Sequence, residues 1–250
     1  MQFLSVDKTK ATAVVTLARG KVNALSEAAV DELAETFQEL AQDTTIRAVV
    51  LTGAGKFFSF GFDIPGFMDY PASDFGRFLQ KFSSLYNRLY LSPKPLIAAI
   101  NGHCIAGGCM LTNACDYRVM VDSGAKISLN EVTFGATVFA GSVEILRHLV
   151  GSKYAEEILL CGRMYGPQDA LRIGLVDELA EASVLLNRAL IVAEENYGYD
   201  ATAFAQIKSL LRKPIADRYA PCEQPSIERF VEIWYAPAMR ERLRQITIHS

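Results

Sequence analysis

Two glycine-containing loops carry residue types that can hold developing negative charge. In one, the apolar run from Leu96 to Ile100 enters an Asn101-Gly102 turn, and the adjacent Gly107 and Gly108 then open a short apolar helix. Glycines let a ligand atom approach the backbone, and the free N–H groups at a helix start favour negative charge. The segment is therefore a candidate half of an oxyanion hole or an anion site. Close packing of the strand on the helix, which also needs small residues, is the alternative.

The second loop follows another apolar strand and has a similar exit. Residues 47–52 form the strand, a Gly-Ala-Gly turn follows at 53–55, and the loop 57–64 reads FFSFGFDI. An oxyanion hole needs two converging N–H donors from separate loops. Neither loop has the spacing of a nucleotide-binding loop. The pair therefore favours a site that polarises a carbonyl oxygen.

Glu131 is the candidate acid–base residue for such a site. An oxyanion hole makes the carbon next to the carbonyl acidic, and a base must then lie over that carbon. Glu131 follows a short extended segment, 126–129, in an otherwise apolar context. Desolvation there would raise the pKa of the carboxyl toward neutrality, which suits a group that both takes and returns a proton. A solvated loop glutamate is the alternative from the residues alone.

Together the two loops resemble the signature of the crotonase (enoyl-CoA hydratase/isomerase) superfamily, an F-S-A-G-x-D-[LI] loop and a strand followed by N-G-x-x-x-x-G-G. The resemblance implies that the Phe62 and Gly107 N–H groups hold the thioester oxygen of an acyl-CoA. Segments 17–25, 93–95, 115–118 and 174–177 also resemble the family, so the likeness covers most of the chain. It implies an α/β fold, with a crotonase-like spiral of ββα turns over residues 1–195. Residues 196–250 would form a C-terminal helical region for trimerisation or for covering the active site.

One departure from the family pattern narrows the predicted reaction. Hydratases of the family carry a second glutamate three residues after Gly107, where this chain has Met110. Adding water takes two carboxylates, whereas moving a double bond from C3 to C2 needs one that shuttles a proton. The chain also resembles the mitochondrial-type Δ3,Δ2-enoyl-CoA isomerases around Cys115 and Leu129. We therefore predict a Δ3,Δ2-enoyl-CoA isomerase with Glu131 as the proton shuttle.

Three other interpretations stay open at this stage. Hydration or thioester hydrolysis could run on the same fold with one carboxylate, and a catalytically silent acyl-CoA-binding member would also fit. Glu144 lies near the acid of other isomerase branches, but its spacing is that of a helix face.

The resemblance also implies contacts for the acyl-CoA. The CoA nucleotide and pantetheine would lie along 17–25, with Arg19, Lys21 and Lys208 as candidate phosphate partners. Solvated surface cations are the alternative. Asp63 is expected to accept backbone N–H groups that fix its loop. The full predicted binding set is Arg19, Lys21, Val22, Ala24, Phe60, Gly61, Asp63, Ile64 and Gly108.

Aromatic residues are the candidate walls of the acyl pocket. Phe67, Met68 and Phe139 would line it if they face inward, and ordinary core is the alternative. Phe60 and Phe62 stand where the family commonly has small residues, so their rings would narrow the pocket.

Composition indicates one sizeable globular unit. The chain has 250 residues, 50% apolar and 21% charged, with a formal charge of −3, which gives no basic surface for nucleic acid. No apolar stretch approaches the roughly 18–20 residues of a membrane span, and no signal pattern opens the chain, so we expect a cytoplasmic protein that does not enter a membrane. No metal or redox cofactor is expected, and coenzyme A enters only as part of the substrate. The family resemblance implies a homotrimer or a dimer of trimers.

The cysteine pattern fits the same compartment. The five cysteines match no zinc-binding spacing and are expected to be free thiols in a reducing compartment: Cys104, Cys109, Cys115, Cys161 and Cys222.

Hydrophobic periodicity predicts the elements that must position these residues. Alternating strands and helices imply parallel pairing with right-handed crossovers. Beyond about residue 182 the pattern is helical only. The predicted strands are 11–18, 47–52, 96–100 and 117–121, and the predicted helices are 28–41, 73–91, 140–150, 152–161, 185–195, 202–211 and 227–246, with one further helix between Pro167 and Gly174.

Overall fold

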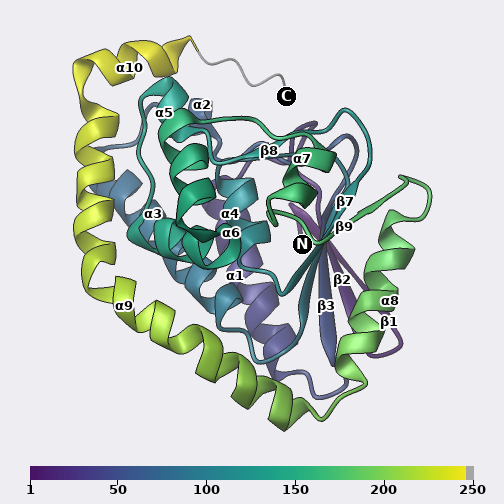
Figure 1. Ribbon diagram of the computed structural model, residues 1–250. Helices are drawn as coiled ribbons and strands as arrows, with labels where there is room; N and C mark the ends of the chain where they lie inside the picture. The colour runs from purple at the N-terminus through teal and green to yellow at the C-terminus, as the bar shows by residue number, and fades with distance from the viewer. Residues whose placement is uncertain (246–250) are drawn as a thin grey trace.

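The computed structural model describes residues 1–245 as two sheets flanked by helices (Figure 1). Within these residues, one sheet has six strands in the order β1-β2-β3-β5-β7-β9 and the other has three in the order β4-β6-β8. Among the paired strands of residues 1–245, only β1 and β2 run antiparallel. The strands are β1 (Leu4–Thr9), β2 (Thr12–Leu17), β3 (Ala48–Gly53), β4 (Phe57–Ser59), β5 (Leu96–Ile100), β6 (His103–Ile105), β7 (Tyr117–Val121), β8 (Ile127–Ser128) and β9 (Glu178–Ala180).

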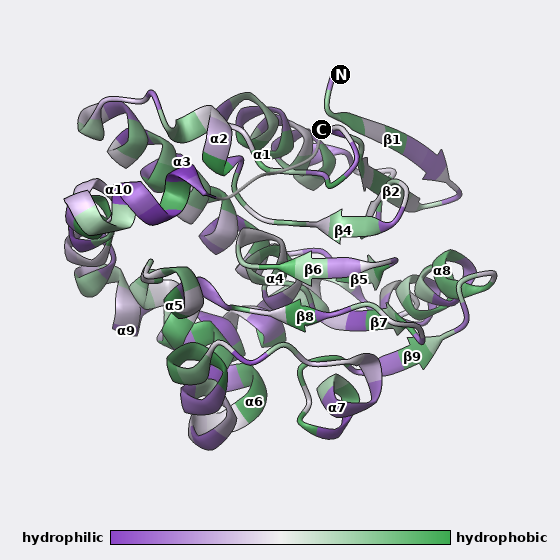
Figure 2. Cartoon of the chain, turned by 90° about the horizontal axis from the view of Figure 1, so that it is seen from above, coloured by the Kyte–Doolittle hydropathy of each residue, from purple (hydrophilic) through white to green (hydrophobic). Residues whose placement is uncertain are grey.

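Each ββα turn of the chain gives one strand to each sheet. β3 is followed by β4, β5 by β6, and β7 by β8, and Figure 2 shows the three short strands side by side. The structure therefore has the predicted α/β spiral of ββα turns. The first strand, β1, was not predicted. Its apolar and polar residues alternate and most of its side chains are exposed at the edge of the sheet, so it gives no apolar run in the sequence.

The parallel strands read as apolar runs because both of their faces are covered. Every residue of β3 and β5 is buried. One face packs against the helix α8, and Figure 1 shows this helix alongside the sheet. The first eight helices are α1 (Glu27–Gln42), α2 (Ile64–Phe67), α3 (Ala72–Tyr90), α4 (Gly107–Asn113), α5 (Glu131–Phe134), α6 (Ala140–Cys161), α7 (Pro167–Arg172) and α8 (Leu185–Tyr197).

Local signals in the sequence set several helix ends. The Ser26 hydroxyl accepts the Ala29 N–H (3.3 Å) and caps α1. Gly151 has a φ of 76° and interrupts α6, which is where the sequence placed the junction between two helices. The predicted helices 28–41, 73–91 and 185–195 are confirmed to within two residues at each end.

The C-terminal region contradicts one prediction. The sequence predicted separate helices at 202–211 and 227–246, but α9 (Ala201–Tyr235) runs without a break and α10 (Pro237–Arg244) follows. The prolines Pro214, Pro221 and Pro225 lie within α9, and all three are exposed. A long helix curves with its convex side toward solvent, and its backbone hydrogen bonds are longest on that side. The three prolines therefore remove N–H donors where these bonds are weakest. Figure 1 shows α9 curving around the body of the protein. Residue 246 lies outside the described residues, and the division at 195/196 stays a prediction.

An aromatic cluster joins α9 to α3. Trp234 stacks on Phe75 with ring centroids 4.5 Å apart, and Phe67 lies 4.1 Å from Phe78. Phe139 packs on Phe230 in the same cluster. Phe67 and Phe139 are fully buried in this core and are not among the residues that line the cavity of the candidate site, so for both the structure favours the ordinary-core alternative. Met68 is partly buried and packs against the core.

No helix within residues 1–245 is both long enough and apolar enough to cross a lipid bilayer. All five cysteines are free thiols, three of them buried and two exposed.

Candidate active site

The two glycine loops meet in the structure. Gly61 has a φ of 88°, and a Cβ there would lie 3.0 Å from the Cβ of Ala106 and 3.1 Å from the backbone N of Gly107. A Cβ on Gly107 would lie 3.0 Å from the ring of Phe62. Both positions need glycine because the loops approach so closely. Segments about 45 residues apart in the chain thus share one site.

Both loops present a free backbone donor. The N–H groups on either side of Phe62 are used, since Gly61 donates to Ser59 Oγ (3.1 Å) and Asp63 donates to Leu25 O (3.1 Å). Within residues 1–245, the Phe62 and Gly107 N–H groups have no acceptor. Two such donors side by side are the arrangement that can stabilise an oxyanion.

Both residues line a cavity of about 250 Å³ whose surface is mostly apolar. Its walls also come from α5 and α9, through Phe134, Phe230 and Trp234. These three were missed by the sequence analysis. Ile227, Phe230 and Trp234 have the spacing of a buried helix face, but nothing local indicates what that face covers. The remaining lining residues are Phe60, Ile64, Ile105, Ala106, Met110, Asn130 and Glu131.

Glu131 is buried against this cavity. It is the first residue of α5, just after β8, and is 5% exposed. Burial raises the pKa of its carboxyl to about 8. Its Oε2 and the Oδ1 of Asn130 are buried and lack a hydrogen-bond partner in the described part of the chain. A carboxyl with this pKa is able to both accept and return a proton near neutral pH.

Within the described chain, Glu131 is the one acidic side chain of the cavity lining. Met110 is buried in the wall, and the Ser142 hydroxyl donates to its sulfur (3.4 Å). Glu144 lies outside the cavity and pairs with Arg147 (3.0 Å) and Arg218 (3.2 Å). The structure therefore brings one carboxyl, not two, to the free donors.

The segment 17–25 supports the loop of Phe62. Arg19 pairs with Asp63 (2.5 Å) and donates to Ala24 O (3.1 Å), and Asp63 accepts the Gly66 N–H (3.4 Å) at the start of α2. The Phe60 N–H donates to the carbonyl of Val22 (2.9 Å). Most of the predicted binding set is thus gathered in one place.

Two predicted cations lie in different surroundings. Lys21 is exposed. Lys208 is 6% exposed and pairs with Asp116 (2.6 Å), so the suggestion that it binds a CoA phosphate is wrong. The sequence pattern indicates a surface position for Lys208, but in the structure its side chain is buried and its ion pair joins α9 to the core. Among residues 1–245, no group of three or more His, Cys, Asp or Glu side chains has the geometry of a metal site.

Comparisons with known proteins agree with this geometry. The family model for enoyl-CoA hydratase/isomerase matches residues 7–232. The short-chain-enoyl-CoA hydratase of Clostridium acetobutylicum is 35% identical over 192 residues, which is 76% of this chain and 73% of the relative. The mitochondrial enoyl-CoA delta isomerase 1 of Rattus norvegicus is 31% identical over 220 residues, 87% of this chain and 76% of the relative. The crystal structure of human mitochondrial delta3-delta2-enoyl-CoA isomerase matches with a TM-score of 0.93 at 28% identity and covers 97% of this chain and 96% of that one. Hydratases and isomerases are similarly close in sequence, so identity does not choose between their reactions.

Proposed function

The chain belongs to the enoyl-CoA hydratase/isomerase family, and we propose that it moves the double bond of a 3-enoyl-CoA to the 2-position. The observation that carries this proposal is the single carboxyl, Glu131, in a cavity with two free N–H donors. Coenzyme A is part of the substrate, and no separate cofactor is invoked.

The proposed reaction moves one proton and two electron pairs. The Phe62 and Gly107 N–H groups hold the thioester oxygen, which lowers the pKa of the C2 proton. Glu131 takes that proton, and the C2–H electrons form a C1–C2 double bond with negative charge on the thioester oxygen. The carbonyl then re-forms, a double bond forms between C2 and C3, and the former C3–C4 pair takes the proton from Glu131 at C4. No water enters and no electron leaves, so one carboxyl suffices.

Met110 supports isomerisation over hydration. Adding water requires a group that holds and activates the water while another delivers the proton to C2. The thioether of Met110 cannot accept a proton at neutral pH, and its sulfur already receives the Ser142 hydroxyl. Hydration of a 2-enoyl-CoA is the second candidate, favoured by the 35% identity to a hydratase.

We propose that the CoA moiety lies along the segment that supports the Phe62 loop. Arg19 is partly exposed and Lys21 is exposed, and both lie near the predicted contacts Val22 and Ala24. The apolar walls of the cavity suit an apolar acyl group. A cytoplasmic location remains a prediction.

An exposed apolar ridge on α9 supports the proposed self-association into a homotrimer or a dimer of trimers. Ile207, Leu210 and Leu211 are 58%, 66% and 61% exposed, and their spacing places them on one face of the helix. Exposed apolar residues gathered on one face are typical of a protein–protein contact. The sedimentation velocity of Leu210→Glu against wild type tests this, and an unchanged coefficient contradicts it.

Ultraviolet absorbance tests the proposed reaction, because conjugation of the double bond with the thioester creates a new absorption band. Wild type should convert 3-enoyl-CoA, and Glu131→Gln should lose at least about 100-fold in kcat, the usual range for a general base. Glu144→Gln is the matched control, since its carboxyl lies outside the cavity. No conversion by wild type at several chain lengths, with acyl-CoA bound, would refute the proposal. Loss of absorbance from 2-enoyl-CoA would instead support hydration.

A further inference from the structure

The guanidinium of Arg212 makes an unusual set of contacts between α9 and the core. Its Nη1 donates to the carbonyls of Tyr90 (2.8 Å) and Ala114 (3.0 Å), and its Nη2 donates to the carbonyl of Cys115 (3.1 Å). Nη2 also pairs with Asp116 (2.9 Å). The guanidinium lies over the ring of Tyr90, 4.6 Å from its centroid. All four terminal N–H groups are thus engaged, and three of them bind main-chain oxygens.

Two of these oxygens belong to the C-terminal end of α4. Ala114 is the C-cap of this helix, and Cys115 follows it. The first residue of the same helix is Gly107, which lines the cavity and whose N–H has no acceptor within residues 1–245. A seven-residue helix is only about 10 Å long, so a clamp on one end fixes the position of the other.

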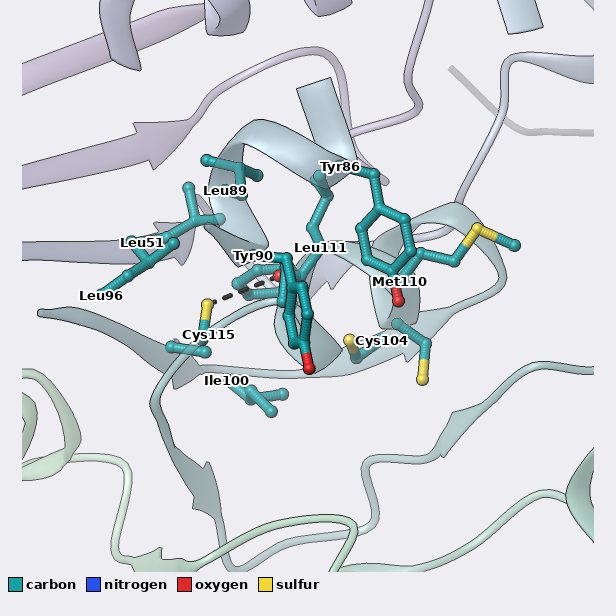
Figure 3. Close-up of a cluster of buried hydrophobic side chains, with 14 of the residues drawn as sticks. Leu51, Tyr86, Leu89, Tyr90, Leu96, Ile100, Cys104, Met110, Leu111 and Cys115 are labelled. Atoms are coloured by element: carbon teal, nitrogen blue, oxygen red, sulfur yellow. Dashed lines mark hydrogen bonds between the residues drawn. The ribbon is translucent and has the colours of Figure 1, made fainter. Parts of the chain in front are cut away.

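Neighbouring groups make this clamp rigid. The Oδ2 of Asp116 accepts both the Leu96 N–H at the start of β5 (2.8 Å) and the ammonium of Lys208 (2.6 Å), while its Oδ1 binds Arg212. Arg118 donates to the Cys115 carbonyl as well (2.9 Å). Figure 3 shows Tyr90, Leu111 and Cys115 gathered around α4 in the buried core. The C-terminal end of α4 is therefore held to β5 through Asp116 and to β7 through Arg118.

The same long helix reaches the cavity further along the chain. Arg212 contacts α4, whereas Phe230 and Trp234 of α9 form part of the cavity wall. The same helix, α9, therefore forms part of the cavity wall and, through Arg212, holds the end of α4.

We propose that Arg212 is a positioning residue, which holds α4 so that the Gly107 N–H points at the thioester oxygen. This inference rests on the proposed function, since it assigns Gly107 to the oxyanion hole. Arg212 touches no lining residue of the cavity, and it acts through the helix alone. Loss of the Arg212 contacts with α4 should therefore weaken polarisation of the thioester carbonyl and leave the CoA contacts intact.

Polarisation can be measured without turnover. A conjugated aryl-enoyl-CoA with an electron-donating ring substituent absorbs at longer wavelength when N–H donors polarise its carbonyl. The red shift on binding, kcat and KM are measured for wild type, Arg212→Gln and Arg212→Lys. Glu223→Gln is the docking control, because Glu223 joins α9 to the Gly141 N–H (2.7 Å) and, within residues 1–245, makes no hydrogen bond or ion pair with α4. Lys213→Gln, on the exposed face of α9, is the surface control.

We expect Arg212→Gln to lose about 10-fold in kcat, less than the 100-fold or more for deleting a donor, with KM within about twofold and a smaller red shift. Arg212→Lys keeps the charge but not the four hydrogen bonds of the guanidinium. Its kcat and its red shift should therefore lie between those of Arg212→Gln and wild type. Glu223→Gln should lower the Tm while keeping the full red shift.

A folded Arg212→Gln with the red shift and kcat of wild type would overturn the inference. So would an equal loss of red shift in Glu223→Gln, which would show that docking of α9 alone matters. If Arg212→Gln does not fold, wild-type values for Arg212→Lys overturn it. A wild-type enzyme with neither red shift nor isomerisation would instead refute the proposed function.

Discussion

Replacing Glu131 with glutamine should remove a pH-dependent loss of stability. The carboxyl is 5% exposed, and its Oε2 has no hydrogen-bond partner within residues 1–245. Burial raises its pKa from 4.5 to about 8. Between these values the folded chain keeps a proton on Glu131 that the unfolded chain releases. The free energy of unfolding of wild type therefore falls as pH rises from about 4.5 to about 8.

The size of the effect follows from the pKa. Each pKa unit corresponds to about 1.4 kcal/mol, so ionising the buried carboxyl above pH 8 costs about 5 kcal/mol. Between pH 5 and pH 8, the stability of wild type relative to Glu131→Gln should fall by about 3 to 4 kcal/mol. Glutamine has nearly the same shape and does not titrate. Its buried amide adds a constant offset, so only the change with pH is diagnostic.

Urea unfolding at pH 5, 6, 7 and 8 measures this difference. The two proteins are compared at equal concentration, because association changes the apparent stability. Subtracting one from the other cancels the titration of all other groups. Glu144→Gln controls for the loss of one carboxyl outside the cavity. Wild type and Glu131→Gln with parallel stabilities from pH 5 to 8 would refute the view that Glu131 is desolvated.

Three further outcomes follow from the same contacts. If Glu131 is the base, kcat/KM for 3-enoyl-CoA should rise about tenfold per pH unit up to about pH 8 and then level, and a profile already flat at pH 6 contradicts this. Gly108→Ala should lower the Tm measured by circular dichroism by several degrees, because its Cβ would lie 2.6 Å from a backbone oxygen of β4. Gly124→Ala is the control and should keep the Tm of wild type, because a Cβ there meets open space. Asp116→Asn leaves two buried cations without their counter-charge and should lose about 3–5 kcal/mol in urea unfolding. Asp217→Asn, which loses a surface ion pair, should change stability by less than about 1 kcal/mol.

Local patterns were sufficient for much of the fold. The apolar runs of β3 and β5 predicted buried parallel strands, because a strand covered on both faces needs apolar side chains on both. Ser26, just before the predicted helix 28–41, caps α1, and Gly151, between the predicted helices 140–150 and 152–161, interrupts α6. These signals depend on residues that are near one another in the chain, so a sequence displays them directly.

The same reasoning located the centre of the candidate site. Glycines at 61 and 107 are required by the close approach of two loops, and the apolar neighbours of Glu131 predicted its desolvation. The Met110 position, read against the family pattern, predicted a single carboxyl, and the lining has one within the described residues.

What the tertiary structure alone decided is the environment of side chains that meet across long stretches of chain. Phe230 and Trp234 wall the cavity, Lys208 is buried against Asp116, and Phe139 belongs to the core. α9 continues through three prolines because the burial of its inner face outweighs the local cost of the missing N–H groups. The sequence by itself indicated the long buried strands, most of the helices before residue 200 and the two glycine loops. Which of these segments pack together is decided by the free energy of burial summed over the whole molecule, and no local pattern contains that sum.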